Sequence, residues 1–282
     1  MIEARDLEIA IGQRLLLRRL NFTIHRGEFI AILGRNGVGK TTLLRTLCGL
    51  HPTAAGEINV DGRQLASYAR QQRARAIAYV ASDEMMLEML RVRELVANGR
   101  YAHHRWFDWS ETAEDGAAIS SALEAVGMSE FSDRLFATLS SGERQRCWVA
   151  LGLAQEPQVL LLDEPTSHLD VHVAHDILRL LRDQRSRGKS VVCVLHEMNE
   201  ALEFADRIFI LGDGTLLAAA GPSEIVASGA LERAYGIGME ALRSRSGAIR
   251  VFPSVTADAI STAYSATQEA HRALGDRSNP QR

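Results

Sequence analysis

One stretch of the chain has the glycines, the lysine and the hydroxyl group that could bind a chain of phosphates. It consists of Gly34, Arg35, Asn36, Gly37, Val38, Gly39, Lys40, Thr41 and Thr42. From Gly34 to Thr41 it fits G-x-x-x-x-G-K-[ST], a pattern whose glycines let successive backbone N–H groups face one anion. In this pattern Lys40 can reach the β- and γ-phosphates, and the Thr41 hydroxyl can hold Mg²⁺. The stretch therefore predicts a nucleotide site.

The residues on either side of this loop favour a true site over a chance match. The loop follows the apolar run Phe29–Leu33, which has the length of a buried strand. It precedes leucines at helical spacing, Leu43, Leu44 and Leu47. Strand, glycine loop and helix is the context that the motif requires. A match by luck would occur in roughly 1 chain in 100 of this length, even before these flanking elements are considered.

Two acidic residues and a histidine follow other apolar runs. Asp163 ends the run Val159–Asp163, and His196 follows the run Ser190–Leu195. Ligands of α/β proteins bind at the carboxyl ends of the strands, where the carboxylate of Asp163 could hold Mg²⁺ directly or through water. Glu164 follows Asp163, so its side chain points in a different direction from that of Asp163 and could orient or deprotonate an attacking water molecule. The alternatives are a helix N-cap for Asp163, a surface salt bridge for Glu164 and a structural role for His196.

Ser140, Ser141 and Gly142 lie before a predicted helix. Their N–H groups and hydroxyls could form a second cradle for an anion. The alternative is an ordinary N-cap at Ser141, with Arg144 where the glutamate of a capping box would stand.

Further strands and helices are expected around these residues. The alternating segments Leu7–Ile11 and Leu20–Ile24 predict an antiparallel pair of strands. The remaining strands are predicted at Gly56–Gly62, at Ala76–Val80 and in a hairpin at Ile208–Leu217 with Asp213 and Gly214 at its turn. From Val92 to Gly127 the apolar pattern is helical, which indicates a smaller helical subdomain.

The composition bears on compartment and partners. The chain has 282 residues and a net charge of −3, so it could form one large domain or two small ones and has no general affinity for nucleic acid. Its three cysteines, Cys48, Cys147 and Cys193, lie far apart and lack the spacing of metal-binding cysteines, which predicts reduced cytosolic thiols. The first residues lack the apolar region of a signal peptide, and no apolar run approaches the ~18 residues needed to cross a bilayer. Any membrane role is therefore expected to come through a partner.

Four stretches resemble the motifs of the ATP-hydrolysing subunits of ABC transporters. The run Leu139-Ser140-Ser141-Gly142-Glu143 resembles the family signature LSGGQ, and Leu160–Thr166 resembles the Walker B strand with its adjoining glutamate. Ser167–Asp170 resembles the D-loop, and His196 resembles the switch histidine. Order and spacing agree with the family over roughly residues 1–250. The fold class that this resemblance implies is α/β, with a P-loop NTPase core, an antiparallel β subdomain and an inserted α-helical subdomain.

The resemblance also implies a role for each motif. ATP and Mg²⁺ would bind at the loop Gly34–Thr42, with metal ligands from Thr41, Asp163 and Ser82, and Glu164 and His196 would be catalytic. In the family the signature and the D-loop of one chain face the nucleotide on the P-loop of a second chain. The residues in those positions here are Ser140, Ser141, Gly142, Glu143 and Asp170. Because each motif occurs once, the resemblance implies a homodimer or a similar partner, with two ATP molecules between the chains.

Two residues depart from the family pattern. Ser82 stands where the family usually has a glutamine that helps to bind Mg²⁺ and water and couples the site to the membrane partner. A serine hydroxyl could bind Mg²⁺ but reaches less far, so slower or less tightly coupled hydrolysis is expected. Ile11 stands where an aromatic residue usually stacks on adenine, so adenine contact is expected to be apolar and weaker.

Two segments resemble the ATPase sequences of importers of ferric siderophores (above all ferric hydroxamate), haem and cobalamin. They are Val92–Tyr101 and Tyr235-Gly236-Ile237. This implies an ATPase that energises uptake of an iron chelate or a cobalamin-like substrate from the cytoplasmic face of the inner membrane. Its partners would be integral membrane permease subunits and, indirectly, a substrate-binding protein, with no nucleic acid. The alternatives are a soluble ABC ATPase without a transport role and an accessory ABC subunit of weak activity.

The domain prediction is an ABC ATPase domain at 1–254, with its helical subdomain at about 84–155, and a partly disordered extension at 255–282. The methionine-rich segment Ser82–Arg105 is expected to contact the permease, and the alternative is that it packs inside the helical subdomain. His103 and His104 are adjacent and point in two directions on a helix, so we expect them on a solvated or partner-facing surface.

Overall fold

The computed structural model describes residues 1–81, 89–104, 110–245 and 247–254. Within them, the central element is a six-stranded sheet in the order β10-β9-β3-β8-β7-β6. Its strands are β3 (Phe29–Leu33), β6 (Ile77–Val80), β7 (Val159–Asp163), β8 (Ser190–Val194), β9 (Arg207–Gly212) and β10 (Thr215–Ala220). Neighbouring strands are parallel, except that β10 pairs with β9 in antiparallel orientation. The strands and the hairpin predicted here from apolar runs are therefore confirmed.

The central strands are almost entirely apolar because both faces of the sheet are covered. Every residue of β3, β7 and β8 is buried. Alternate side chains of a strand point to opposite faces, so each strand contributes to two cores. In β3, Ile30 and Ile32 face one core, whereas Ala31 and Leu33 face the other.

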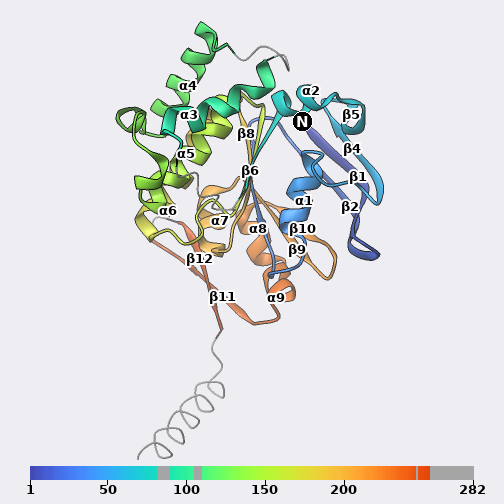
Figure 1. The fold of residues 1–282 in the computed structure, drawn as a ribbon. Helices are drawn as coiled ribbons and strands as arrows, with labels where there is room; N and C mark the ends of the chain where they lie inside the picture. The colour runs from blue at the N-terminus through green and yellow to red at the C-terminus, as the bar shows by residue number, and fades with distance from the viewer. Residues whose placement is uncertain (82–88, 105–109, 246, 255–282) are drawn as a thin grey trace, which may run out of the picture.

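The first core lies between the central sheet, one helix and a smaller antiparallel sheet (Figure 1). The helix is α1 (Lys40–Leu47), and the smaller sheet has the order β2-β1-β4-β5 within the described residues. Its strands are β1 (Ile2–Ile11), β2 (Arg14–Ile24), β4 (Ala55–Val60) and β5 (Arg63–Gln64). The predicted antiparallel pair is confirmed by the pairing of β1 with β2.

Helices cover the opposite face of the central sheet, and Figure 1 shows α3, α4, α5 and α6 on the side away from the small sheet. Besides α1, the helices of the described residues are α2 (Arg70–Ala76), which lies beside the small sheet, α3 (Val92–Ala97), α4 (Ala113–Ala125), α5 (Ser141–Ala154), α6 (Val171–Ser186), α7 (Met198–Phe204), α8 (Pro222–Ala227) and α9 (Ala230–Tyr235). Short 3-10 segments occur at Leu65–Ser67, Asn98–His103, Ser129–Phe131 and Phe136–Thr138. Across the described ranges, no helix is long and apolar enough to cross a membrane.

A buried ion pair joins the helices of the region 92–127. Arg100 donates from Nε to Oδ1 of Asp115 at 2.8 Å, and both side chains are almost fully buried. His104 lies 3.0 Å from the other carboxylate oxygen, and the ring of His103 lies 3.1 Å from the carbonyl oxygen of Gln155. Of the two surfaces predicted for these histidines, the solvated one is wrong, because each histidine is half-buried and contacts a group within the chain. The partner-facing surface stays a prediction.

A hairpin near the end of the described chain was not predicted. It consists of β11 (Met239–Arg243) and β12 (Ile249–Pro253), and it packs on α7. The Asn199 side chain of α7 makes two hydrogen bonds to the backbone of Val251, at 2.8 and 3.1 Å. Glu203, also on α7, pairs with Arg250 and lies 3.1 Å from His175 of α6.

The three cysteines are free and buried. Burial raises the pKa of Cys48 to about 11 and that of Cys147 to about 12, and it also raises the pKa of Cys193 well above its ordinary value. All three are therefore neutral thiols at physiological pH.

Candidate functional site

The glycine loop joins β3 to α1, and its conformation requires glycine at two positions. Gly34 has a φ of +149°, and an added Cβ would lie 2.4 Å from the carbonyl oxygen of Leu211. Gly39 has a φ of +110°, and its Cβ would lie 2.9 Å from the side chain of Leu16. Side chains at these positions would push the loop away from β9 and β2, so the glycines keep its backbone N–H groups close to the sheet edge.

Lys40 lies over this loop and is only 5% exposed. Its Nζ donates to the carbonyl oxygens of Gly34 at 2.8 Å and Arg35 at 3.2 Å. Burial lowers the pKa of this ammonium group, and the negative charges of Glu164 and Asp163 oppose the shift. The loop thus holds a cation whose water shell is largely replaced by carbonyl oxygens, at the place where the motif requires contact with phosphate.

Asp163 lies at the carboxyl end of β7 and is 2% exposed. Its Oδ1 accepts a hydrogen bond from Thr41 Oγ1 at 3.1 Å, and its Oδ2 accepts one from the hydroxyl of Tyr79 at 3.1 Å. Burial raises the pKa of this carboxyl, whereas the bonds from Thr41 and Tyr79 lower it. A carboxylate and a hydroxyl oxygen side by side are suitable donors for Mg²⁺, which binds through few protein oxygens and keeps sites for phosphate and water. The chemistry of these donors therefore fits the ion.

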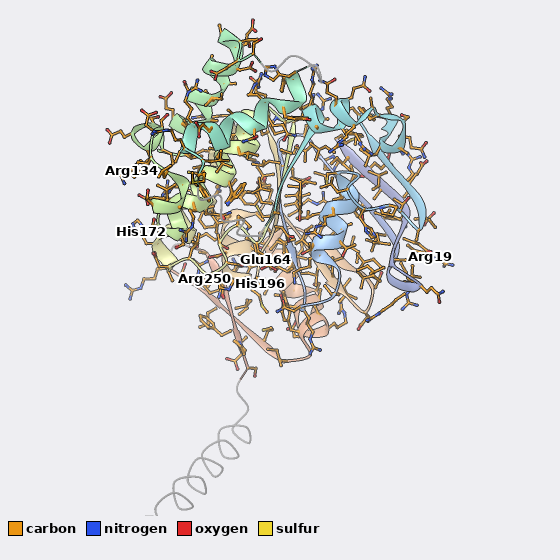
Figure 2. All side chains as sticks on the ribbon, in the orientation of Figure 1. Arg19, Arg134, Glu164, His172, His196 and Arg250 are labelled. Atoms are coloured by element: carbon orange, nitrogen blue, oxygen red, sulfur yellow. The ribbon has the colours of Figure 1, made fainter. Side chains whose placement is uncertain are left out.

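Glu164 and His196 contact each other next to Thr41 and Asp163, and Figure 2 labels them next to one another. Glu164 Oε1 lies 2.7 Å from His196 Nε2, and Glu164 Oε2 accepts from the Ser167 hydroxyl at 3.2 Å. The backbone of Glu164 has a φ of +52°, in the left-handed region, so the chain turns sharply directly after Asp163. The two neighbouring carboxylates consequently have different partners and can have different roles.

The loop, Glu164 and His196 open into one cavity of about 480 Å³. Its lining consists of Ile11, Arg14, Leu16, Asn36, Gly37, Gly39, Lys40, Thr41, Thr42, Glu164 and His196. The structure thus brings together residues predicted here from four separate parts of the chain. Arg14 and Leu16 were not predicted, because nothing in the sequence of a long, partly exposed strand distinguishes them.

The signature residues do not line this cavity. Ser140 caps helix α5: its Oγ accepts from the N–H of Glu143, while Glu143 Oε2 accepts from the N–H of Ser140 at 2.8 Å and from its hydroxyl at 2.9 Å. The expectation of an N-cap at Ser141 is wrong by one residue, because Ser140 forms a full capping box with Glu143. Ser141 and Gly142 stand in the first turn, where N–H groups have no partner within the helix and can face an anion.

Asp170 has the corresponding place at the start of α6, where its Oδ1 accepts from the N–H of Val173 at 3.0 Å. Gly142 packs directly against this helix, since a Cβ added to it would lie 2.6 Å from Val173. The signature and the D-loop residue are therefore held together, away from the cavity of their own chain. Ser82, which was predicted here as a metal ligand, lies outside the described residues.

Three residues next to the site were not given a role by the sequence. Tyr79 contacts Asp163, Arg45 donates from Nε to the Tyr79 hydroxyl at 3.3 Å, and the hydroxyl of Tyr235 accepts from the N–H of Gly34 at 3.2 Å. Tyr235 lies 201 residues from Gly34 in the chain, and Tyr79 lies 84 residues from Asp163. No spacing rule relates positions so far apart.

Comparison with known proteins agrees with this geometry. The family model described as "ABC transporter" matches residues 17–167. The ferric enterobactin transport ATP-binding protein FepC of Escherichia coli (strain K12) is 39% identical over 238 residues, which cover 84% of this chain and 87% of FepC.

Two solved structures agree in fold. One, from an ABC transporter in an inward-facing conformation that is provisionally assigned to the metal-chelate type, has a TM-score of 0.79 at 26% identity and covers 90% of this chain and 98% of its own. Another is a dimeric ATP-binding cassette in a post-hydrolysis state with ADP and Pi, with a TM-score of 0.69 at 26% identity over 79% of this chain and 99% of its own.

The fold and the cavity define a P-loop ATPase. The chain belongs to the ABC transporter family and is one of its ATP-hydrolysing, ATP-binding subunits. The fold class implied by its motifs is thereby confirmed.

Proposed function

We propose that this chain hydrolyses ATP to drive an importer of an iron chelate, such as a ferric siderophore. The observation that supports the ATPase site most directly is the meeting of Lys40, Glu164 and His196 in one cavity. The name of FepC, ferric enterobactin transport, supports the class of substrate. The ATPase itself need not touch the chelate, so this part of the proposal depends on similarity alone.

The loop residues 34–42 would bind the phosphates of ATP through backbone N–H groups and Lys40. Lys40 would exchange the carbonyl oxygens of Gly34 and Arg35 for phosphate oxygens of higher negative charge. Ile11 ends β1 at the rim of the cavity with a half-exposed side chain, which would offer adenine an apolar contact.

Thr41 and Asp163 would hold Mg²⁺ between the protein and the phosphates. The ion would supply charge neutralisation on the phosphate oxygens. Ser82 is proposed as a further ligand from the sequence pattern alone. The protein's own part is to keep the carboxylate of Asp163 beside the Thr41 hydroxyl at 3.1 Å.

Glu164 would orient the attacking water and accept its proton as the water oxygen bonds to the γ-phosphorus. The bond from that phosphorus to the bridging oxygen then breaks, which leaves ADP and inorganic phosphate. His196, at 2.7 Å, would fix the direction of the Glu164 carboxylate and reach the γ-phosphate from the same edge of the sheet.

A second copy of this chain would complete each site. Ser140, Ser141, Gly142, Glu143 and Asp170 lie away from their own cavity, and each motif occurs once in the chain. A two-fold pair would place each signature over the partner's ATP, with one surface used twice. The dimeric cassette with ADP and Pi, which has the same fold, supports this arrangement.

The dimer would bind integral membrane permease subunits at the cytoplasmic face of the membrane and act there as a peripheral protein. A substrate-binding protein would deliver the chelate from the other side. The proposed contact is the segment Ser82–Arg105, of which residues 82–88 and 105 lie outside the described ranges. Within the described part, Met89 is 88% exposed and is free to contact a partner.

The test is the ATPase activity of the purified complex of this chain, its permease and its binding protein. The expected result is that the binding protein loaded with a ferric siderophore stimulates hydrolysis, whereas the unloaded binding protein does not. A Lys40→Ala complex is the matched control and should show no stimulation with either. If the complex hydrolyses ATP but no iron chelate stimulates it, the proposed role in iron-chelate import is wrong.

A further inference from the structure

The carboxylate of Asp163 is held by two hydroxyl groups, one on each oxygen. Thr41 donates to Oδ1, and Tyr79 donates to Oδ2. Thr41 belongs to the P-loop motif, but Tyr79 belongs to no motif described above. Its contact with the buried oxygen of Asp163 is therefore the part of this site that still needs a role.

The pairing of two strands places Tyr79 at this point. Strand β6 runs parallel to β7, and Tyr79 pairs with Leu161, two residues before Asp163. Residues two apart on a strand lie on the same face, so Tyr79, Leu161 and Asp163 all face the layer that contains α1. The phenol hydroxyl reaches the end of the neighbouring strand, where the carboxylate begins.

A cation on α1 orients the Tyr79 hydroxyl. Arg45 lies four residues after Thr41, which places both side chains on one side of the helix. Arg45 Nε donates to the Tyr79 oxygen at 3.3 Å. A hydroxyl has one proton to donate, and with its oxygen accepting from Arg45, that proton is directed toward Asp163.

We propose that Tyr79 is a positioning residue for the metal ligand Asp163. By binding Oδ2, it fixes the rotation of the carboxylate so that Oδ1 stays beside the Thr41 hydroxyl, where the proposed function places Mg²⁺. The inference depends on that proposed metal site. The Tyr79 hydroxyl, oriented by Arg45, would act on the metal through Asp163 without touching the ion.

The test measures binding of the metal, so it does not depend on turnover. Mn²⁺ serves as the probe, together with a non-hydrolysable imido analogue of ATP. The electron paramagnetic resonance signal of free Mn²⁺ is followed, and it falls as the protein binds the ion. Loss of one hydrogen bond of about 1 kcal/mol corresponds to a change of roughly fivefold, so Tyr79→Phe should raise the dissociation constant of Mn²⁺ by about threefold to tenfold. Binding of the analogue without metal should stay unchanged.

Tyr68→Phe is the matched control. The Tyr68 hydroxyl also makes one hydrogen bond, to the carbonyl oxygen of Val60 at 2.9 Å, but in the small antiparallel layer. If Tyr79 only stabilises the fold, both variants should lower the melting temperature and neither should change the affinity for Mn²⁺.

Equal Mn²⁺ affinity in the Tyr79→Phe variant and the wild-type protein would overturn the inference and leave the proposed function standing. If the wild-type protein takes up no Mn²⁺ with the analogue, the proposed metal site fails and the inference fails with it. Should Tyr79→Phe not fold, Arg45→Met replaces it, because it keeps the phenol and removes the donor that orients it. It should weaken Mn²⁺ binding in the same direction, and an unchanged affinity would overturn the inference.

Discussion

The imidazole of His196 holds the carboxylate of Glu164, with 2.7 Å between Nε2 and Oε1. This contact follows from the sheet, because β7 and β8 are parallel and Asp163 pairs with Val194. Glu164 is the first residue after β7, and His196 is the second after β8, so both leave the sheet at the same edge. The alignment of the two strands therefore sets the distance between the two proposed catalytic groups.

Replacing Glu164 with glutamine should abolish most turnover but keep ATP binding. The amide keeps the size of the side chain and loses the charge that accepts a proton, and removal of such a group costs about 100-fold or more in kcat. Steady-state hydrolysis and nucleotide binding by calorimetry measure the two effects. Glu124→Gln is the matched control, since it makes the same change at an exposed position on α4 and should retain full activity. Near wild-type hydrolysis by Glu164→Gln would exclude Glu164 as the base.

ATP with Mg²⁺ should convert the Glu164→Gln variant from monomer to dimer, because a complete site needs the signature of a second chain. Light scattering at micromolar protein measures the mass. Adding Ser140→Arg should block the dimer, since a large cation would fill the cradle at the start of α5. Ser129→Arg, also at an exposed serine, should leave it intact. A monomer at saturating ATP, or a dimer that survives Ser140→Arg, would argue against the two-chain site.

Replacing Asp115 with asparagine should lower the free energy of unfolding by about 1–3 kcal/mol, because buried Arg100 would lose the buried one of its two carboxylate partners and keep only the exposed Glu156. Although burial opposes ionisation of Asp115, hydrogen bonds from Arg100 and Thr112 hold its pKa well below the ordinary value. A lowered pKa stabilises the fold above the unfolded value of about 3.9, and this contribution is lost as the pH falls through the folded pKa.

The difference in free energy of unfolding between Asp115→Asn and the wild-type protein should accordingly have its full size at pH 7 and become smaller only below about pH 4. Urea unfolding over this range measures it. Asp183→Asn, at an exposed position on α6, should change stability little at any pH. An Asp115→Asn variant as stable as the wild-type protein at pH 7 would show that the pair does not hold the helical subdomain together.

A cysteine introduced at Met89 should cross-link to the permease in the purified complex, because this exposed side chain belongs to the segment predicted here to contact the partner. Leu242→Cys, exposed on β11, is the matched control and should not cross-link. If cross-linking from Met89→Cys never captures the permease, the segment packs within its own subdomain instead. Met86, the other position predicted here for cross-linking, lies outside the described residues.

The motifs could be predicted from the sequence because each one is local. The P-loop needs its neighbouring glycines and lysine, and a strand buried on both faces, such as Val159–Asp163, needs a continuous apolar run. The N-cap of α5 was misplaced by one residue because both Ser140 and Ser141 could cap a helix, and only the contact of Ser140 with Glu143 decides between them.

Contacts between distant segments could not be predicted. The bonds of Tyr79 to Asp163 and of Gly34 to Tyr235 depend on strand order and helix placement. The hairpin of β11 and β12 also has no clear pattern in sequence, since β11 reads Met-Glu-Ala-Leu-Arg and is mostly exposed. The effect of Ser82 and the boundaries at residues 84, 155 and 254 stay predictions.

The burial of Cys48, Cys147 and Cys193 also makes the native chain suitable for site-specific labelling. Maleimides and disulfide reagents react with the thiolate, which these three residues rarely form because burial raises their pKa. A cysteine placed on the surface would therefore react much faster than any native thiol. Pairs of spin labels or fluorophores could thus be attached without first removing the natural cysteines, and distances between labelled chains could be followed in an unmodified core.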